Sequence, residues 1–214
     1  MTRTPPPAPL TRATLAAAVS TLARRDHALG GIVAAHGPPP LWARPAGFAT
    51  LARIVLEQQV SLAAAATLYR RVAATLSGGW TPAAVLAVGA EGLRARGLTR
   101  QKARYVVEIA ERIERGDLRL HLLRARSDED AAAELTRVPG IGSWTAGIYL
   151  LMALRRPDVW PPGDLALHKA IAALRGLPRV PSSLEAARIA AEWAPHRAAA
   201  ARILWHGYLA GRAP

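Results

Sequence analysis

"LTRVPGIGSWTA", residues Leu135 to Ala146, separates two segments that otherwise have the character of helices. Pro139, Gly140 and Gly142 disfavour a helix, so the chain is expected to reverse direction within a few residues. Glycine has no Cβ, which lets backbone N–H groups come close to a ligand. The next helix also presents its unpaired N–H groups and the positive end of its dipole. The turn is therefore suited to bind an anion such as a phosphate.

The chain is strongly basic, with 28 Lys and Arg against 15 Asp and Glu and a formal net charge of +13 among 214 residues. Only Lys102 and Lys169 are lysines, and arginine is the side chain best suited to phosphates. This charge indicates a polyanion partner, most simply nucleic acid. The alternative is a GC-rich genome, which raises Arg and Ala together. With no Cys, the chain can form neither disulfides nor Cys-ligated zinc or iron–sulfur sites.

The fold class predicted from the sequence is all-α. Half of the residues (51%) are apolar, many of them Ala, and apolar positions recur at helical spacing. Alternation with period two, which would indicate strands, is hard to find. No apolar run is long enough to span a bilayer, and the start "MTRTPPPAPL" lacks the core of a signal peptide. We therefore expect a cytoplasmic, nucleoid-associated bacterial protein.

Breakers and capping residues predict the order of elements. Residues 1–10 are expected to form a disordered Pro-rich tail, and residues 11–214 a helical domain. The predicted helical segments are Thr11–Ala35, Gly47–Leu76 with a break near Val60–Ser61, one opened by Thr81-Pro82, Thr99–Leu118, Ser127–Arg137, Ser143–Arg155, Leu165–Leu174, one from Ser182 or Ser183, and a last one broken by Pro195.

The spacing Leu-x-x-Val-Pro-Gly-Ile-Gly-x-x-Thr-Ala is that of the helix-hairpin-helix DNA-binding motif, here at about residues 129–155. An ordinary helical hairpin also uses Gly and Pro. Asp164 follows in "PPGDLAL", where by itself it could be only a helix N-cap. With "ARIVLEQQVSLAAAATLYRRV", "GLTRQKARYV" and "AEWAPHRAAAARILWHGYL", these features resemble the helix-hairpin-helix DNA glycosylase superfamily. Within it, the chain from roughly Pro45 to Gly211 looks like the DNA-3-methyladenine glycosylase II family.

The resemblance implies a two-lobed helical body with a DNA cleft between the lobes. It also implies a monomeric, monofunctional hydrolase that flips out and excises alkylated purines, such as 3-methyladenine and 7-methylguanine, from double-stranded DNA in base excision repair. No cofactor would be needed for catalysis. Three alternatives stay open: the same fold acting on deaminated or oxidised bases, a non-catalytic module for distorted DNA, and a hairpin that is only a helix junction.

The resemblance also implies roles in catalysis and base binding. Asp164 matches the catalytic aspartate of the family, whose carboxylate would stabilise the positively charged sugar. Trp144 occupies the place of the Schiff-base Lys of bifunctional relatives, and an indole cannot form that adduct. Trp144 and Trp205 match aromatic positions of the base pocket, although core packing is the alternative for each. Tyr149 and Ile148 are further candidates for that pocket.

The remaining implied residues would contact the DNA backbone or fill the duplex. Gln59 matches the residue that wedges into the gap left by the flipped nucleotide, or else it is a solvated helix residue. In the hairpin, the carbonyls of Thr136, Val138 and Ile141 match a structural Na⁺ or K⁺ site. The N–H groups of Gly140, Gly142 and Trp144 would bind a phosphate. Lys102 would add a phosphate contact, or else it is a solvated charge on its helix. No iron–sulfur cluster is implied.

Overall fold

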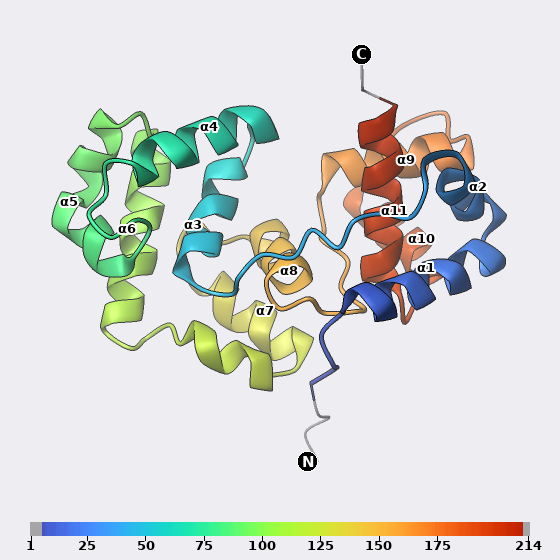
Figure 1. The fold of residues 1–214 in the computed structure, drawn as a ribbon, viewed down its shortest axis with the longest axis horizontal. Coiled ribbons are helices and arrows are strands. Elements are labelled where there is room, and N and C mark those ends of the chain that lie inside the picture. The colour runs from blue at the N-terminus through green and yellow to red at the C-terminus, as the bar shows by residue number, and fades with distance from the viewer. Residues whose placement is uncertain (1–5, 212–214) are drawn as a thin grey trace. The chain divides into compact units, whose positions relative to one another are not determined.

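The computed structural model describes residues 6–211, and within this range it contains eleven α-helices, one short 3₁₀ helix and no strand. The prediction of an all-α fold is therefore confirmed. The chain forms two units, whose helices Figure 1 shows. Unit 1 holds Pro6 and Arg44–Tyr149, and unit 2 holds Pro7–Ala43 and the chain from Leu150 onward. Unit 2 is therefore assembled from segments at both ends of the sequence.

Within residues 6–211, unit 1 is built from six α-helices and one short 3₁₀ helix, and several of the α-helices start at predicted caps. They are α3 (Phe48–Glu57), α4 (Leu62–Ala73), α5 (Pro82–Ala95), α6 (Arg100–Glu114), η1 (Leu120–Ala125), α7 (Asp128–Thr136) and most of α8 (Ser143–Met152). Thr81, Thr99 and Ser127 each accept a hydrogen bond from a backbone N–H of the following helix. The predicted break near Val60–Ser61 is confirmed, because Ser61 caps α4.

Helix α3 is the central element of unit 1 for the candidate site. Leu51, Ile54 and Val55 are completely buried, at the three- and four-residue spacing of one helix face. This face packs against α4 and α6, and Figure 1 shows α6 in turn beside α5. Burial of each such side chain contributes about 2 kcal/mol, so the end of α3 is held firmly by its core face.

Unit 2 is arranged around α11 (Arg197–Ala210), which contacts α1 (Arg12–Arg25), α2 (His27–His36), α9 (Leu165–Arg175) and α10 (Ser183–Ala191) (Figure 1). The Ala-rich start of α11, residues 198–201, is completely buried. Small side chains let neighbouring helices approach closely, which explains how one helix can contact four others.

Arg202 of α11 is completely buried and ties together three segments of unit 2. Its guanidinium donates hydrogen bonds to the carbonyls of Leu41, Ala198 and Leu151 at 2.8 to 2.9 Å. Burial lowers the pKa of Arg202 to about 10, so the group stays charged near neutral pH. The carbonyls satisfy the donors of this buried cation, and they fix the loop that leads to Trp42.

The prediction of one helical run over Thr11–Ala35 is wrong, because the chain breaks at Asp26 into α1 and α2. The Asp26 carboxylate accepts hydrogen bonds from the N–H groups of α2, including Leu29 at 3.2 Å. It also accepts from Arg175 at 2.7 Å and from the indole of Trp193 at 2.9 Å. These two partners are distant in the sequence, so local patterns could not reveal them.

The expected disordered tail is only partly within the described residues, since residues 1–5 lie outside them. From Pro7 onward the tail is packed against unit 2. Leu10 is buried, its N–H donates to the carbonyl of Arg155 at 2.7 Å, and Arg156 donates to the carbonyl of Pro7. This packing differs from the expectation because Leu10 provides an apolar anchor among the prolines.

Several boundaries differ by less. Helix α8 ends at Met152 rather than Arg155, α5 contains a kink at Gly89 (φ 66°), and η1 was not predicted. None of the helices within residues 6–211 combines the length and the hydrophobicity needed to cross a membrane.

Replacing Asp26 with Asn tests the importance of its charge. Burial by itself would raise the pKa of Asp26, but hydrogen bonds from Trp193, Leu29 and Arg175 outweigh it and lower that pKa. The carboxylate therefore stabilises the fold above its unfolded pKa of about 4, and this contribution is lost as pH falls through the lower folded pKa. We expect Asp26→Asn to reduce the free energy of unfolding by about 2 kcal/mol at neutral pH.

The measurement is urea unfolding of both proteins at neutral pH and at the acidic end of their stable range. The difference between them should shrink on acidification. A difference that stays constant with pH would show that the charge of Asp26 is not what stabilises unit 2.

Candidate nucleic-acid interface and active site

The hairpin of residues 137–142 joins α7 to α8 in unit 1 by a tight turn. The N–H groups of Val138 and Ile141 donate to the carbonyls of Leu135 and Val138 at 3.1 and 3.0 Å. Gly140 has φ 87°, in the left-handed region that favours glycine. A Cβ at Gly140 would also collide with the ring of Tyr105 on α6. The glycine is thus required twice, by its backbone conformation and by its neighbour.

Gly142 serves a different purpose from Gly140. Gly142 is exposed and its φ is not positive. A Cβ added to Gly142 would meet no atom within 4 Å. Gly142 lies directly before Ser143, where α8 begins and where the helix dipole favours negative charge. Val138 and Ile141, by contrast, are buried and anchor the turn. The exposed side of the hairpin therefore has the shape and the electrostatics to bind a phosphate.

The turn between α3 and α4 presents the predicted wedge residue to solvent. Gln59 is exposed and has φ 56°, a conformation that is uncommon for residues other than glycine and costs about 1 kcal/mol. Val60 and Leu62 beside it are 45% and 59% exposed, so the turn presents apolar as well as polar side chains to solvent. A projecting turn with one polar and two apolar side chains has the character needed to enter a stack of bases.

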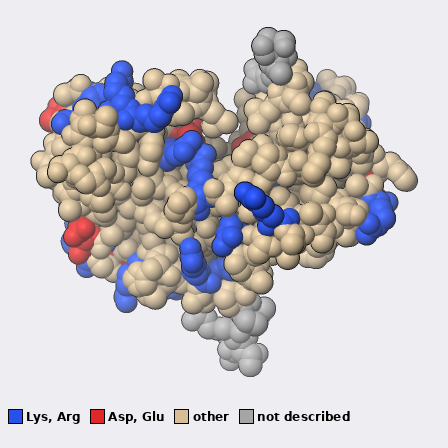
Figure 2. All heavy atoms as spheres, viewed as in Figure 1, with Lys and Arg blue, Asp and Glu red and all other residues tan. Residues whose placement is uncertain are grey.

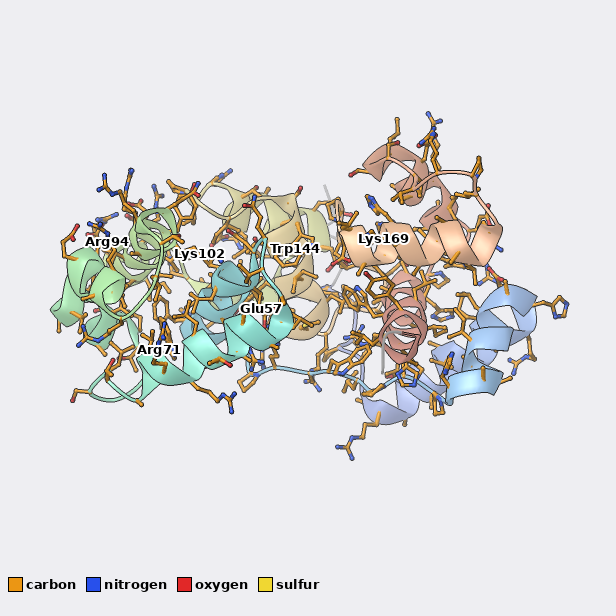
Figure 3. The ribbon with its side chains drawn as sticks, turned by 90° about the horizontal axis from the view of Figure 1, so that it is seen from above. Glu57, Arg71, Arg94, Lys102, Trp144 and Lys169 are labelled. Carbon is orange, nitrogen blue, oxygen red and sulfur yellow. The ribbon has the colours of Figure 1, made fainter. Side chains whose placement is uncertain are left out.

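Lys102 makes contacts that differ from the expected phosphate contact. Its ammonium donates to the carbonyls of Leu56 and Gln58, both at 2.8 Å, at the end of α3. Burial lowers the pKa of Lys102. Figure 3 labels Lys102 and Trp144, which come from α6 and α8 of unit 1. The Lys102 ammonium thus provides hydrogen bonds for carbonyl groups at the C-terminal end of α3.

Tyr149 was expected to line a base pocket, and the structure gives it a place in the core instead. Its side chain is completely buried, and its hydroxyl accepts a hydrogen bond from the N–H of Gly47 at 2.9 Å. Burial raises the pKa of Tyr149 to about 12. Ile148 beside it is buried as well, whereas Trp144 at the start of α8 is partly exposed.

Asp164 begins α9 in unit 2 and is both a cap and a partner of an aromatic residue. Its carboxylate oxygen Oδ1 accepts hydrogen bonds from the N–H of Leu167 at 3.0 Å and from the indole Nε1 of Trp205 at 3.2 Å. The side chain is buried, with the residue only 8% exposed. The N-cap interpretation is therefore confirmed, and the link to Trp205 adds a contact that capping alone does not need.

An aromatic group surrounds Trp205, and sequence reasoning missed part of it. Trp42 lies edge-on to Trp205 with ring centroids 6.4 Å apart, and it also contacts His206 at 6.3 Å. Trp42 lies in the connection between α2 and α3. It has φ 47°, and Arg202 holds the carbonyl of the preceding Leu41. Its only signal in the sequence was an aromatic residue in a Pro-rich connection.

His168, one turn after Asp164 on α9, was also not predicted as a site residue. Its ring is buried, and within residues 6–211 its Nε2 atom has no hydrogen-bond partner in the protein. Burial lowers the pKa of His168, while the negative charge of Asp164 acts in the opposite direction. The imidazole is therefore neutral at neutral pH and sits close to the carboxylate.

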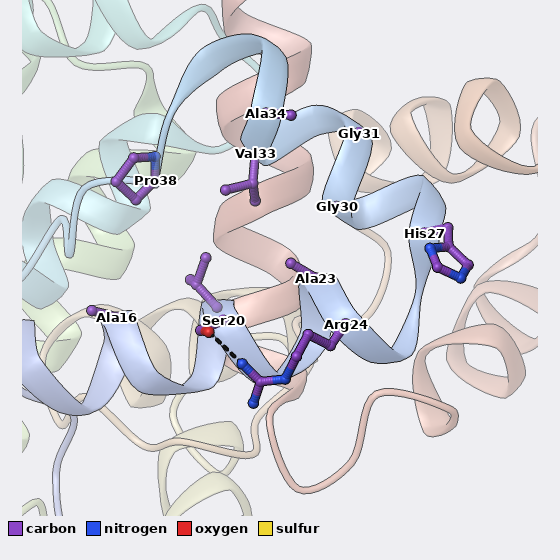
Figure 4. A pocket seen from close by; sticks show the side chains of 11 residues that line it. Ala16, Ser20, Ala23, Arg24, His27, Gly30, Gly31, Val33, Ala34 and Pro38 are labelled. Atoms are coloured by element: carbon purple, nitrogen blue, oxygen red, sulfur yellow. Dashed lines mark hydrogen bonds between the residues drawn. The ribbon is translucent and has the colours of Figure 1, made fainter.

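Within the part of the chain that the structure describes, neither the pocket between α1 and α2 nor a metal-binding cluster coincides with the predicted site residues. A pocket of about 660 Å³ lies in unit 2 between α1 and α2, and Figure 4 shows its lining. It is lined by residues such as Val19, Ala23 and Val33, and none of the predicted site residues contributes to it. Among the described residues, no three His, Cys, Asp or Glu side chains cluster as a metal site.

Charge on the visible face is mostly positive. Figure 2 shows a face formed mostly by uncharged residues, on which groups of Lys and Arg outnumber the few Asp and Glu, in agreement with the net charge of +13. The predicted residues fall into two groups: the hairpin, Gln59, Lys102 and Trp144 belong to unit 1, and Asp164 and Trp205 to unit 2.

The model of the HhH-GPD superfamily of base excision DNA repair proteins matches residues 52–196, and the chain belongs to this superfamily. The resemblance read from the sequence is therefore confirmed.

Individual relatives support the same assignment. The chain is 32% identical over 158 residues to DNA-3-methyladenine glycosylase 1 of Schizosaccharomyces pombe, covering 72% of this chain and 69% of that protein. It is 28% identical over 184 residues to the putative DNA-3-methyladenine glycosylase YfjP of Bacillus subtilis, covering 83% of this chain and 64% of the relative, just under two thirds. The solved structure of S. pombe 3-methyladenine DNA glycosylase (Mag1) with abasic DNA is similar with a TM-score of 0.78 and 28% identity, covering 90% and 95% of the two chains.

Replacing Tyr149 with Phe tests whether this residue belongs to the core or to a ligand pocket. Removal of the hydroxyl leaves the buried N–H of Gly47 without its acceptor, so we expect the free energy of unfolding to fall by about 1 to 3 kcal/mol. Chemical denaturation measures the loss. At a temperature where both proteins are folded, affinity for DNA should be unchanged. Unchanged stability with altered ligand binding would instead return Tyr149 to a pocket.

Proposed function

We propose that the protein is a DNA glycosylase that excises alkylated purines, of the 3-methyladenine and 7-methylguanine type, from double-stranded DNA. The observation that carries this proposal is the buried Asp164 carboxylate, held at the start of α9 and hydrogen-bonded by the indole of Trp205. The names of the relatives, which describe 3-methyladenine glycosylases, support it. The reaction is the hydrolysis of an N-glycosidic bond.

The chemistry follows from a carboxylate placed beside an aromatic ring. As the bond between C1′ and the base nitrogen breaks, its electron pair leaves with the base and positive charge develops on the sugar. The Asp164 carboxylate stabilises that charge, and water then adds to C1′ and loses a proton. An alkylated purine already carries positive charge, so it departs as a neutral base without needing an acid.

Recognition of the base would rest on aromatic side chains at the positions that the family resemblance implies. Trp144 and Trp205 can hold a flipped cationic purine by stacking and cation–π attraction. Trp42, edge-on to Trp205, would orient that ring. Gln59 would fill the space left in the duplex and hydrogen-bond the unpaired base. Preference for 3-methyladenine or 7-methylguanine would follow from how well each base stacks on such a ring.

The hairpin would grip the DNA backbone beside the damaged nucleotide. The N–H groups of Gly140, Gly142 and Trp144 are proposed as donors to a phosphate. The carbonyls of Thr136, Val138 and Ile141 are neutral oxygens of the kind that suit Na⁺ or K⁺. The Val138 carbonyl accepts one bond from Ile141 and keeps a second lone pair for an ion. Such an ion would supply positive charge between hairpin and phosphate, with no part in bond cleavage.

Asp164→Asn is the decisive substitution for this proposal. Asn is also a good N-cap, so the N–H of Leu167 keeps its acceptor and α9 should remain folded. We expect single-turnover release of 3-methyladenine and 7-methylguanine from methylated duplex DNA to fall by at least about a hundredfold, because a charge that stabilises the transition state is lost. High-performance liquid chromatography of released bases measures the rates.

Glu192→Gln is the matched control, since it removes one exposed carboxylate from the same unit. It should leave base release at the wild-type rate. If wild type releases neither base, or Asp164→Asn equals it, the proposed activity is wrong. Release of hypoxanthine, uracil or 8-oxoguanine alone would assign the fold to deaminated or oxidised bases. Tight, salt-sensitive binding without any release would indicate a non-catalytic DNA-binding protein.

The product should be an intact abasic strand, because the family resemblance assigns Trp144 to the position of the Schiff-base Lys, and an indole cannot form that adduct. We expect no covalent protein–DNA complex after borohydride reduction during turnover, and strand cleavage only after hot alkali. Denaturing gels resolve both products. A reduced adduct that disappears in Lys169→Met would reveal a lyase amine outside the hairpin and contradict monofunctional chemistry.

We also propose that the protein acts as a monomer on damaged DNA.

A further inference from the structure

The exposed Gln59 turn is held from behind by two neighbouring side chains of unit 1. The last carbonyls of a helix have no partner within the helix and need one elsewhere. At the end of α3, Lys102 provides it for Leu56 and Gln58, with two hydrogen bonds of 2.8 Å to one ammonium. A charged donor makes stronger hydrogen bonds than a neutral one. The backbone just before Gln59 is therefore fixed to α6.

The side chain of Gln58 fixes the same turn to the hairpin. Its amide Nε2 donates to the carbonyl of Gly140 and to the hydroxyl of Thr145, both at 2.9 Å. Thr145 is buried in the first turn of α8, so this contact is sheltered from water. The Gln59 turn and the phosphate-binding hairpin are thereby joined by direct hydrogen bonds rather than by packing alone.

Helix α6 completes the connection, because it also touches the hairpin. The ring of Tyr105, three residues after Lys102, lies so close to Gly140 that no Cβ would fit there. Gln101 in turn donates a hydrogen bond to the Tyr105 hydroxyl at 2.8 Å. One face of α6 thus supports the end of α3 through Lys102 and the hairpin through Tyr105.

We infer that Lys102 and Gln58 are positioning residues, which hold the Gln59 turn at a fixed place relative to the Pro139–Gly142 hairpin without touching DNA themselves. Gln59 has the strained φ of 56°, and such a conformation persists only when its surroundings hold it. A phosphate gripped by the hairpin and a side chain entering the duplex must lie a fixed distance apart along one DNA. The hydrogen bonds of Gln58 and Lys102 provide this spacing.

This inference rests on the proposed function, because that function gives Gln59 its role as a wedge. For Lys102, it assigns a positioning role in place of the predicted phosphate contact. The two roles predict different salt dependence. A lost phosphate contact reduces the slope of log affinity against log salt concentration by about 0.9. A lost positioning contact leaves that slope unchanged and weakens only the step in which the turn enters the duplex.

The experiment uses a duplex with a tetrahydrofuran abasic site opposite 2-aminopurine, whose fluorescence rises when the turn unstacks it. The full-length variants are Lys102→Met and Gln58→Met, which keep similar side-chain length without the donors, with Gln59→Ala as the reference for a missing wedge. Arg115→Met, at the exposed end of the same helix, removes an equal charge as control. Circular dichroism and thermal unfolding confirm that each variant is folded.

With saturating protein, we expect each of the two variants to lower the equilibrium constant for unstacking by about tenfold, because each loses two hydrogen bonds that hold the turn. The double variant should lose little more than the worse single one, because both act on the same turn. The salt slopes of affinity should equal that of wild type, and Arg115→Met should unstack normally. Should Lys102→Met fail to fold, Gln58→Met carries the test alone.

Wild-type unstacking by folded Lys102→Met and Gln58→Met would overturn the inference. A salt slope reduced by about 0.9 in Lys102→Met, with normal unstacking in the complex, would assign this lysine to a phosphate and overturn it too. Absence of any wild-type fluorescence change would remove its premise. None of these readouts requires base release, so a failure of the proposed enzymatic activity is observed separately in the release assay.

Discussion

The Asp164 carboxylate accepts hydrogen bonds from the N–H of Leu167 and from the indole of Trp205. The first bond gives the N–H of Leu167, in the first turn of α9, an acceptor that the helix itself does not provide. The second bond brings an aromatic ring to the same oxygen. The side chain is buried at the start of α9, so one residue both starts the helix and places its carboxyl group beside an aromatic ring. The candidate chemistry of unit 2 depends on this arrangement.

The candidate DNA-binding elements of unit 1 lie at helix ends for the same reason. The hairpin precedes the first N–H groups of α8, and the Gln59 turn follows the last carbonyls of α3. A helix end is the place where backbone groups remain available to a ligand, and where a partner from another helix can fix the chain. Lys102 and Tyr149 hold the two ends of α3 in this way. Exposed turns thus gain defined positions from buried neighbours.

Elements whose signals lie within a few residues could be predicted from the sequence. The caps Thr99 and Ser127, the break at Ser61 and the hairpin glycines all act on backbone groups of their immediate neighbours. The hairpin and Asp164 also carried the superfamily assignment, and Asp164 could be named as an N-cap before its partner was known. Asp26 could not be read in this way, because Arg175 and Trp193 reach it from far along the chain.

The sequence by itself determined the all-helical class and the glycine turn, since these depend on local conformational preference and spacing. The candidate catalytic carboxylate, Asp164, was named through the family resemblance. Only the tertiary structure decided that Lys102 serves carbonyls of α3, that Tyr149 belongs to the core, and that Trp42 joins Trp205. The physical reason is that a long polar or aromatic side chain takes its role from whichever partner the packed helices bring within hydrogen-bonding or contact distance. Sequence spacing alone does not encode that partner.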